Sequence, residues 1–247
     1  MADLGWRRVQ SSAIARWAAA AEPVARRIVT ESQEPWRCGG TWFVGLDALP
    51  SGVDGSINNV ELPLDDIGLS PVPLHPAQIS VTRAGYPQRD EGESEKAFDF
   101  RRVRDAAHLD GLLPVGPQKR RMVQEPHGWI LGLPLNRADA GASPLVVWEG
   151  SHIVMGAALR AAFAGRADDL ENFDITEAYQ AARKRVFDNC PRVELPGQPG
   201  EAVILHRHMI HGVAPWADGA TAGAPGRMVA YFRPLLPTVA AWLQDDA

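Results

Sequence analysis

The stretch Ala107-His108-Leu109-Asp110-Gly111 decides how this chain of 247 residues is interpreted. Side chains of a β-strand alternate between its faces, so His108 and Asp110 project from one face if the stretch is extended. An imidazole nitrogen and a carboxylate oxygen on one face are able to bind the same metal ion. We therefore predict that a β-strand here presents His108 and Asp110 as two metal ligands.

A third ligand must come from elsewhere, and the obvious source is Leu205-His206-Arg207-His208-Met209-Ile210-His211-Gly212. His206 and His208 share a strand face by parity, and either is also suited to a role beside the metal or the substrate. Spacing alone does not decide between these two and His211. Two histidines and one carboxylate on one metal face, with the opposite positions open, is the arrangement of non-haem Fe(II) oxygenases.

Length and composition indicate one domain over residues 1–247. A chain of this length with 45% hydrophobic residues is able to bury one sizeable core. Its 20 prolines and 23 glycines indicate many turns, as all-β architectures require. Residues from about 1 to 36 are expected to form a helical N-terminal segment, and residues from about 153 to 189 a helical insertion.

Charge and cysteine content exclude several classes of protein. The net charge of −5 argues against nucleic acid and anionic membranes as partners. The N-terminus lacks the apolar stretch of a signal peptide, and no run approaches transmembrane length. Cys38 and Cys190 fit neither a disulfide framework nor a zinc site. We expect a cytoplasmic protein that is a monomer or homodimer.

Hydrophobic periodicity predicts the main elements. An apolar stripe predicts a helix over residues 11–30, which Pro23 is expected to kink or divide. Residues 46–76 are expected to be mostly loop, and one role for such a loop is to cross the mouth of a site. The charged run 89–96 is expected to be a solvated loop. Strands are predicted at 41–45, 78–83, 128–135, 144–148, 201–205 and 228–232.

The order of the motifs resembles the phytanoyl-CoA dioxygenase family. It consists of H-x-D at 108 and 110, G-S-H at 150–152, His211-Gly212 and Arg227, within a stretch from about residue 40 to 234. The resemblance implies a mainly β fold with flanking helices, a double-stranded β-helix of the jelly-roll, cupin-like kind. It also implies that His108, Asp110 and His211 bind Fe(II), and that Arg227 binds the distal carboxylate of 2-oxoglutarate, with O₂ as the further co-substrate.

The position of Arg227 agrees with that role. The separation from His211 (227 − 211 = 16 residues) allows one strand, a turn and the start of the next strand. A guanidinium pairs with a carboxylate through two parallel hydrogen bonds. Arg233 is the competing candidate, further from the turn. Many related oxygenases have a serine two residues after the arginine; here that position is Val229, so Tyr86 or Tyr231 is a candidate for the missing hydroxyl.

Other residues are candidates for contact with the co-substrate. His127 and Trp129 are placed to contact 2-oxoglutarate or cover the iron, although core or strand-edge positions explain them equally well. Gln78 and Thr82 offer hydrogen bonds, although such polar residues often face solvent. We interpret His152 as structural, closing a turn.

The function that the resemblance implies is decarboxylation of 2-oxoglutarate to succinate and CO₂, coupled to oxidation of a small molecule, usually by hydroxylation. Halogenation is disfavoured because related halogenases lack the carboxylate ligand, which is present here as Asp110. One alternative is a cupin-type enzyme of non-oxidative metal chemistry. Another is a non-catalytic small-molecule binding jelly roll.

Six cations surround the H-x-D motif: Arg101, Arg102, Arg104, Lys119, Arg120 and Arg121. In an acidic chain, such a group suggests a local positive field that attracts an anionic substrate. The alternative is that these side chains form weak surface pairs with the nearby acidic residues Glu91, Glu93, Glu95 and Asp99.

Overall fold

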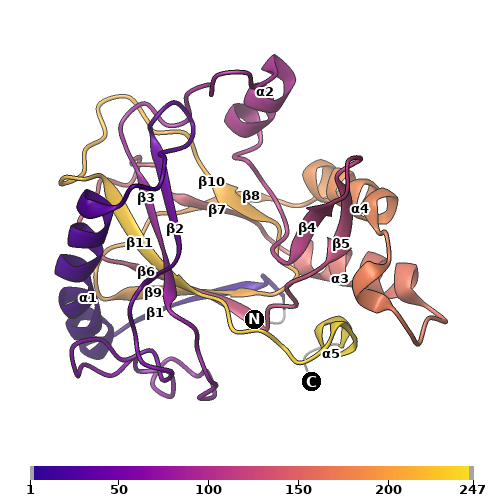
Figure 1. The fold of residues 1–247 in the computed structure, drawn as a ribbon, viewed down its shortest axis with the longest axis horizontal. Helices are drawn as coiled ribbons and strands as arrows, with labels where there is room; N and C mark the ends of the chain where they lie inside the picture. The colour runs from indigo at the N-terminus through magenta and orange to yellow at the C-terminus, as the bar shows by residue number, and fades with distance from the viewer. Residues whose placement is uncertain (1–2, 245–247) are drawn as a thin grey trace.

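Two antiparallel sheets face each other in the structure, a computed structural model that describes residues 3–244 (Figure 1). The large sheet has the order β1-β9-β6-β11-β3-β2, and the small sheet has the order β10-β7-β8. In the large sheet the strands are β1 (Trp6–Gln10), β9 (Glu201–His206), β6 (Trp129–Pro134), β11 (Arg227–Phe232), β3 (Ala77–Thr82) and β2 (Trp42–Leu49). The small sheet contains β10 (His211–Val213), β7 (Leu145–Trp148) and β8 (Arg192–Leu195), and a separate hairpin joins β4 (Leu112–Val115) to β5 (Arg120–Val123).

The chain alternates between the two sheets, from β6 to β7 and from β9 through β10 to β11. Apolar side chains fill part of the space between them: Ile130 and Val203 from the large sheet meet Leu145 and Val147 from the small one. Because β-strand residues alternate between faces, each strand has one side facing this interior and one facing the helices.

Helix α1 (Ser12–Glu31) covers the outer face of the large sheet. Trp17 packs edge-on against Phe232, with ring centroids 5.7 Å apart, in a core that also holds Met228 and Ala230. These even-numbered residues of β11 therefore face α1. The odd-numbered positions, beginning with Arg227, face the space between the sheets.

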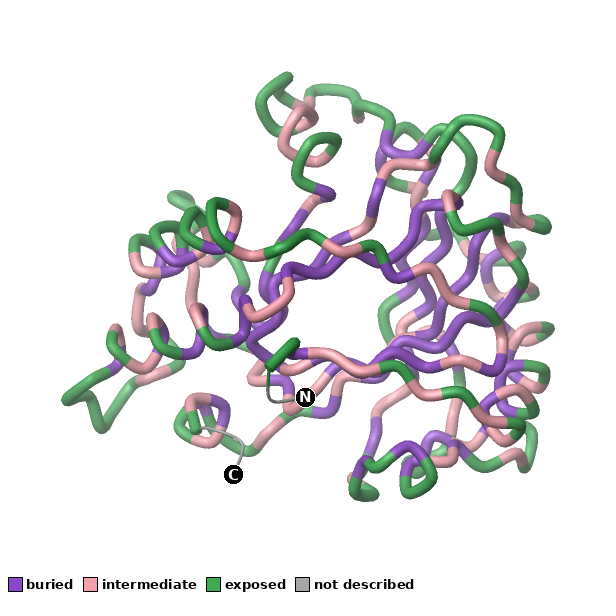
Figure 2. Tube along the Cα trace, turned by 180° about the vertical axis from the view of Figure 1, so that it is seen from behind, coloured by how far each residue is buried: buried purple, intermediate pink, exposed green. Residues whose placement is uncertain are grey.

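The remaining helices lie mainly around the small sheet. Helices α3 (Ser151–Phe163), α4 (Thr176–Asn189) and α5 (Val239–Leu243) bury its outer residues Val146 and Trp148 in a second core. A 3₁₀ turn, Leu170–Asn172, lies between α3 and α4. Helix α2 (Glu95–Val103) stands apart at one end of the sheets (Figure 1). Figure 2 shows buried strands in the centre and exposed residues on the outer turns of the helices.

The prediction of a mainly β fold with flanking helices is confirmed, and all six predicted strands are present. Helices α3 and α4 lie in the stretch 153–189 that was expected to be a helical insertion. Other expectations were wrong. The N-terminal segment also contains strand β1, and of the two effects expected of Pro23, a kink or a division, the continuous α1 contradicts the division. The charged run ends inside α2, which begins where the side chain of Ser94 accepts a hydrogen bond from the Ala97 N–H.

The long loop between β2 and β3 was a candidate to cross the mouth of a site, but it packs against the core instead. Its apolar residues join the core beneath α1: Ile57, Leu62, Leu64, Ile67, Leu69 and Leu74. The loop thus completes the core on the outer side of the large sheet. Within residues 3–244, no helix is both long and apolar enough to cross a membrane.

Candidate metal centre

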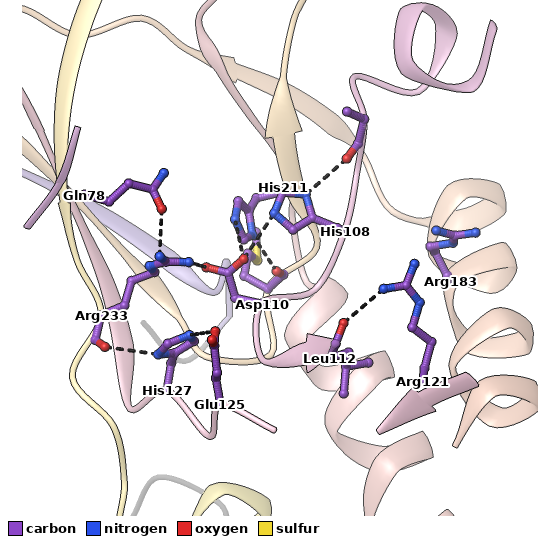
Figure 3. Close-up of polar contacts among 12 residues, drawn as sticks. Gln78, His108, Asp110, Leu112, Arg121, Glu125, His127, Arg183, His211 and Arg233 are labelled. Carbon is purple, nitrogen blue, oxygen red and sulfur yellow. Dashed lines mark hydrogen bonds and ion pairs between the residues drawn. The ribbon is translucent and has the colours of Figure 1, made fainter. Parts of the chain in front are cut away.

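His108, Asp110 and His211 come together at one end of the interior between the sheets (Figure 3). Asp110 Oδ1 lies 3.1 Å from His108 Nε2 and 3.8 Å from His211 Nε2. One potential ligand atom from each residue lies within 4.8 Å of the other two. Two neutral imidazoles and one carboxylate are a suitable donor set for Fe(II) or a similar divalent metal.

The backbone brings the two histidines together. His108 and His211 form an isolated β-bridge, with N···O distances of 2.9 and 3.1 Å. Asp110 lies in the turn that follows, so the prediction that the motif occupies a regular strand was wrong. Gly111 has φ +88°, and a Cβ there would lie 2.4 Å from the Glu125 carbonyl oxygen, so glycine permits this turn.

An ion pair between the exposed Arg192 and the buried carboxylate of Asp105 anchors the segment before His108. Arg192 donates to both carboxylate oxygens of Asp105, at 2.7 and 2.8 Å. Because of these bonds, the pKa of Arg192 is raised. The Asp105 carbonyl accepts a hydrogen bond from Val213, and a Cβ on Gly212 would lie 2.1 Å from that carbonyl oxygen. Gly212 therefore lets the ligand segment approach β10 closely.

The second nitrogen of each histidine contacts a backbone carbonyl. His108 Nδ1 lies 3.1 Å from the Ala106 oxygen, and His211 Nδ1 lies 3.0 Å from the Met209 oxygen. With a metal ion bound, the proton would lie on Nδ1 in both rings, which would leave both Nε2 lone pairs available to the ion beside Asp110. Metal-binding histidines are oriented by this kind of hydrogen bond, so the residues present fit a metal ion.

The charges in the cluster favour ligand forms at Asp110 and His211. Burial lowers the pKa of His211 to about 4, although Asp110 opposes this, so its imidazole is neutral near pH 7. Desolvation raises the pKa of Asp110, but the His108 hydrogen bond and the nearby cationic groups hold it well below its usual value. Desolvation lowers the pKa of His108, but the hydrogen bond to Asp110 and the negative charge of that carboxylate outweigh this effect, so the pKa of His108 is raised.

Arg233, immediately after β11, contacts this cluster directly. Its Nη1 lies 3.3 Å from Asp110 Oδ2, and its Nη2 donates to Gln78 Oε1 at 2.7 Å. The two carboxylate oxygens thus have different neighbours, since Oδ1 faces the histidines and Oδ2 faces Arg233. Gln78 is brought to the site through Arg233.

His127 lies beside the same group. Its Nδ1 is 3.0 Å from the Arg233 carbonyl oxygen, and its Nε2 is 3.3 Å from Glu125 Oε2. Burial lowers the pKa of His127. Trp129 is not brought to the three ligands, because its ring packs against the core beneath α1.

Arg227 occupies the opposite end of β11. It is paired in register with Thr82 of β3 and is only 8% exposed. Within residues 3–244 its guanidinium makes no hydrogen bond or ion pair, and the buried Thr82 hydroxyl has no hydrogen-bond partner. Neither Tyr86 nor Tyr231 is hydrogen-bonded to Arg227 in this part of the chain. Thr82 is thus the hydroxyl that the structure places opposite this arginine.

The competing histidines form a separate cluster. The ring of His208 packs edge-on against Trp242, with centroids 4.5 Å apart, and His206 lies next to both His208 and His152. Burial and the neighbouring cationic groups hold the pKa of His208 well below its usual value. His152 stands in the first turn of α3 rather than closing a turn as expected.

Sequence reasoning missed the Asp105–Arg192 pair and underrated Arg233. The partners Asp105 and Arg192 are 87 positions apart and carry no shared motif. For Arg233, the sequence showed that it lies at the end of a strand. It did not show that this end of β11, rather than the Arg227 end, reaches Asp110.

Comparisons with known proteins give distant structural likenesses. No family model and no curated protein matches the chain. The epimerase SnoN in complex with Fe3+, alpha ketoglutarate and nogalamycin RO shares 15% identity at a TM-score of 0.48, over 98% of this chain and 86% of SnoN. The alpha ketoglutarate dependent carbocyclase SnoK from nogalamycin biosynthesis shares 14% identity at a TM-score of 0.44, over 94% of this chain and 79% of SnoK. EctD from S. alaskensis with 2-oxoglutarate and 5-hydroxyectoine shares 13% identity at a TM-score of 0.42, over 94% of this chain and 71% of EctD. At these TM-scores the likenesses do not identify a family.

Proposed function

We propose that this protein is an Fe(II)- and 2-oxoglutarate-dependent oxygenase that oxidises a small molecule, usually by hydroxylation, and converts 2-oxoglutarate to succinate. The observation that carries the proposal is the convergence of His108, Asp110 and His211, whose ligand atoms lie within 4.8 Å of one another. We further propose that the two facing sheets form a double-stranded β-helix of the phytanoyl-CoA dioxygenase type.

The three residues have distinct tasks in this proposal. His211 and His108 present Nε2, and their Nδ1 contacts to backbone carbonyls keep the rings oriented. Asp110 contributes Oδ1, while Arg233 holds Oδ2 and so restricts rotation of the carboxylate. Fe(II), when bound, supplies open coordination positions for a 2-oxo acid and O₂.

We assign the distal carboxylate of 2-oxoglutarate to Arg227 and Thr82. A buried guanidinium without an acidic partner and a buried hydroxyl without a hydrogen-bond partner, both within residues 3–244, lie in register on adjacent strands. An unsatisfied buried polar group is costly, and a bound carboxylate would satisfy both. Gln78 lies on the same face of β3 as Thr82 but at the other end of the strand, where it contacts Arg233.

Release of succinate tests the proposal. Purified protein with Fe(II), ascorbate and 2-oxoglutarate is incubated with a library of small metabolites, and succinate is measured with and without each compound. We expect one class of compounds to stimulate succinate release in the wild type and not in Asp110→Ala. Stimulation that persists in Asp110→Ala contradicts the ligand assignment. A protein that binds metal at these residues but neither binds nor consumes 2-oxoglutarate belongs to the cupin-type alternative.

A further inference from the structure

The candidate metal centre is open on the side of His108, whose side chain is 51% exposed. In the close-up, Arg121 of β5 and Arg183 of α4 are drawn on this side of the three ligands, with Arg233 and Gln78 on the other (Figure 3). A substrate that enters from solvent next to His108 approaches past β5 and α4.

The arginines around this side fall into two sets. Arg101, Arg102 and Arg120 each form an ion pair with a carboxylate, of Glu93, Asp99 and Asp174 respectively. The pairs of Arg101 and Arg102 are with the nearby acidic residues that the surface-pairing explanation names, so that explanation holds for two of the six cations, whereas Arg120 pairs with Asp174 instead. Arg104, Arg121 and Arg183 have no carboxylate partner within residues 3–244.

Aromatic rings hold two of the unneutralised guanidinium groups. Arg183 lies 4.9 Å from the Phe100 ring centroid and 5.1 Å from that of Tyr179. Arg104 lies 4.8 Å from the Phe187 ring centroid, and Arg183 lies 6.0 Å from the same centroid. A ring face attracts a guanidinium without neutralising it, so both charges remain available to an anion.

Arg121 is directed along the segment that carries Asp110. Its Nη1 donates to the carbonyl of Leu112, two residues beyond Asp110, at 3.1 Å. Its backbone is tied to the start of α4, since the Arg121 N–H donates to the Thr176 hydroxyl at 2.7 Å. Thr176 and Arg183 are seven residues apart, and therefore lie on one face of α4. Arg121 and Arg183 thus belong to one packed unit of β5 and α4.

We propose that Arg121 and Arg183, supported by Arg104, form a substrate subsite that binds a carboxylate or phosphate group. The inference rests on the proposed function, because it places the anionic end of the substrate on the open side of the metal ligands. 2-Oxoglutarate does not need this subsite, since its distal carboxylate is assigned to Arg227 and Thr82. The substrate class is accordingly a small anionic molecule.

Saturation-transfer NMR tests the subsite without metal. The probes are 3-phenylpropionate, phenyl phosphate and the neutral 3-phenylpropanamide, with excess 2-oxoglutarate present to occupy Arg227. We expect at least one anionic probe to bind about 10-fold more tightly than the amide, as a charge-assisted hydrogen bond predicts. Arg183→Gln and Arg121→Gln should each remove most of this difference.

Two variants control for charge and folding. Arg185→Gln removes the same charge from the exposed side of α4 and should leave probe binding unchanged. Arg183→Lys keeps the charge and should retain part of the preference for anions, even if the glutamine variant is destabilised. Equal binding of the amide and both anions, or undiminished anion binding in Arg183→Gln and Arg121→Gln, overturns the proposal. Which anion is preferred distinguishes a carboxylate from a phosphate substrate.

Mn(II) then locates the subsite relative to the metal ligands. In Mn(II)-loaded wild type, the proton signals of the bound anionic probe should broaden, and in Asp110→Ala they should not. Specific anion binding without broadening in a protein that holds Mn(II) places the anion elsewhere and overturns the proposal. Failure of the wild type to bind Mn(II) contradicts the proposed function instead, while the metal-free measurement still decides whether Arg121 and Arg183 bind an anion.

Discussion

Two arginines at opposite ends of β11 differ in what their charges contact. Arg233 has an acidic partner in Asp110 and a second contact in Gln78. Arg227 is more deeply buried, and within residues 3–244 its guanidinium has neither an ion pair nor a hydrogen bond. By parity both positions belong to the face of the strand between the sheets.

The difference shows that burial and residue type do not by themselves assign a role. Arg233 is held by the protein and contacts the proposed metal ligand Asp110, whereas Arg227 retains its capacity to bind an anion. We therefore expect changes at the Asp110 end to affect metal binding, and changes at the Arg227 end to affect the requirement for 2-oxoglutarate.

Asp110→Ala should have the largest effect, because it removes the carboxylate that distinguishes the two ends of β11. We expect metal affinity and succinate release to fall by roughly a thousandfold or more, since the only anionic ligand is lost. Isothermal titration with Mn(II) and the succinate assay measure the two effects, and circular dichroism checks the fold. Near-normal turnover in a folded variant would exclude Asp110 as a ligand.

Arg227→Gln should raise the apparent requirement for 2-oxoglutarate by about 30- to 150-fold. This range follows from the loss of a charge-assisted pair of about 2–3 kcal/mol. Metal affinity should remain that of the wild type, and Arg227→Lys should recover only part of the loss. If Arg233→Gln shows the larger increase instead, the assignment of the two arginines is reversed.

Arg192→Gln should lower metal affinity about 10-fold, because it releases Asp105 and the turn that positions His108. At saturating metal, the requirement for 2-oxoglutarate should not change. Arg102→Gln, which breaks an exposed ion pair with Asp99, is the matched control. An equal effect of the two variants on metal affinity would argue against a positioning role for Arg192.

Acid pH leaves both arginines charged and instead tests His208, which lies in the separate histidine cluster. The folded-state pKa of His208 is depressed, so below pH 6.5 the unfolded chain binds a proton that the folded chain does not. The free energy of unfolding should therefore decrease as pH falls, by about 1 kcal/mol from this residue between pH 6.5 and 5.5.

Urea unfolding of metal-free protein at both pH values measures this contribution. His208→Gln should remove about 1 kcal/mol of the pH dependence, while His75→Gln, outside the buried His208 cluster, serves as the control. An unchanged pH dependence in a folded His208→Gln variant contradicts the neutral, buried assignment.

Arg233→Gln should have the smallest effect, a gain in Mn(II) affinity of about threefold. A positive charge 3.3 Å from Asp110 Oδ2 repels a second cation bound to the same carboxylate, and glutamine removes this repulsion. Competition titrations with a metal-binding dye resolve such a change. A loss of affinity would show that Arg233 mainly orients Asp110 rather than competing for its charge.

Long periodic segments were predictable from the sequence, and so was the short but wholly apolar β7, whereas the other short strands were not. The apolar stripe from Ile14 to Ile28 identified α1, and runs such as 128–135 and 228–232 identified buried strands. Strands β4, β5, β8 and β10 have only three or four residues, too few to show a period. Helix α2 was missed because it buries no residue fully and so has no apolar face to detect.

By itself, the sequence determined His108 and Asp110 as candidate ligands from the donor types that Fe(II) accepts, and it left His206, His208 and His211 as rivals for the third position. Only the tertiary structure decided between the rivals. His208 and His211 are three residues apart, yet the bridge to His108 brings His211 to Asp110, while Trp242 covers His208. Which end of β11 meets the ligands depends likewise on strand pairing between distant segments. Such pairing depends on packing over the whole chain, and no local pattern encodes it.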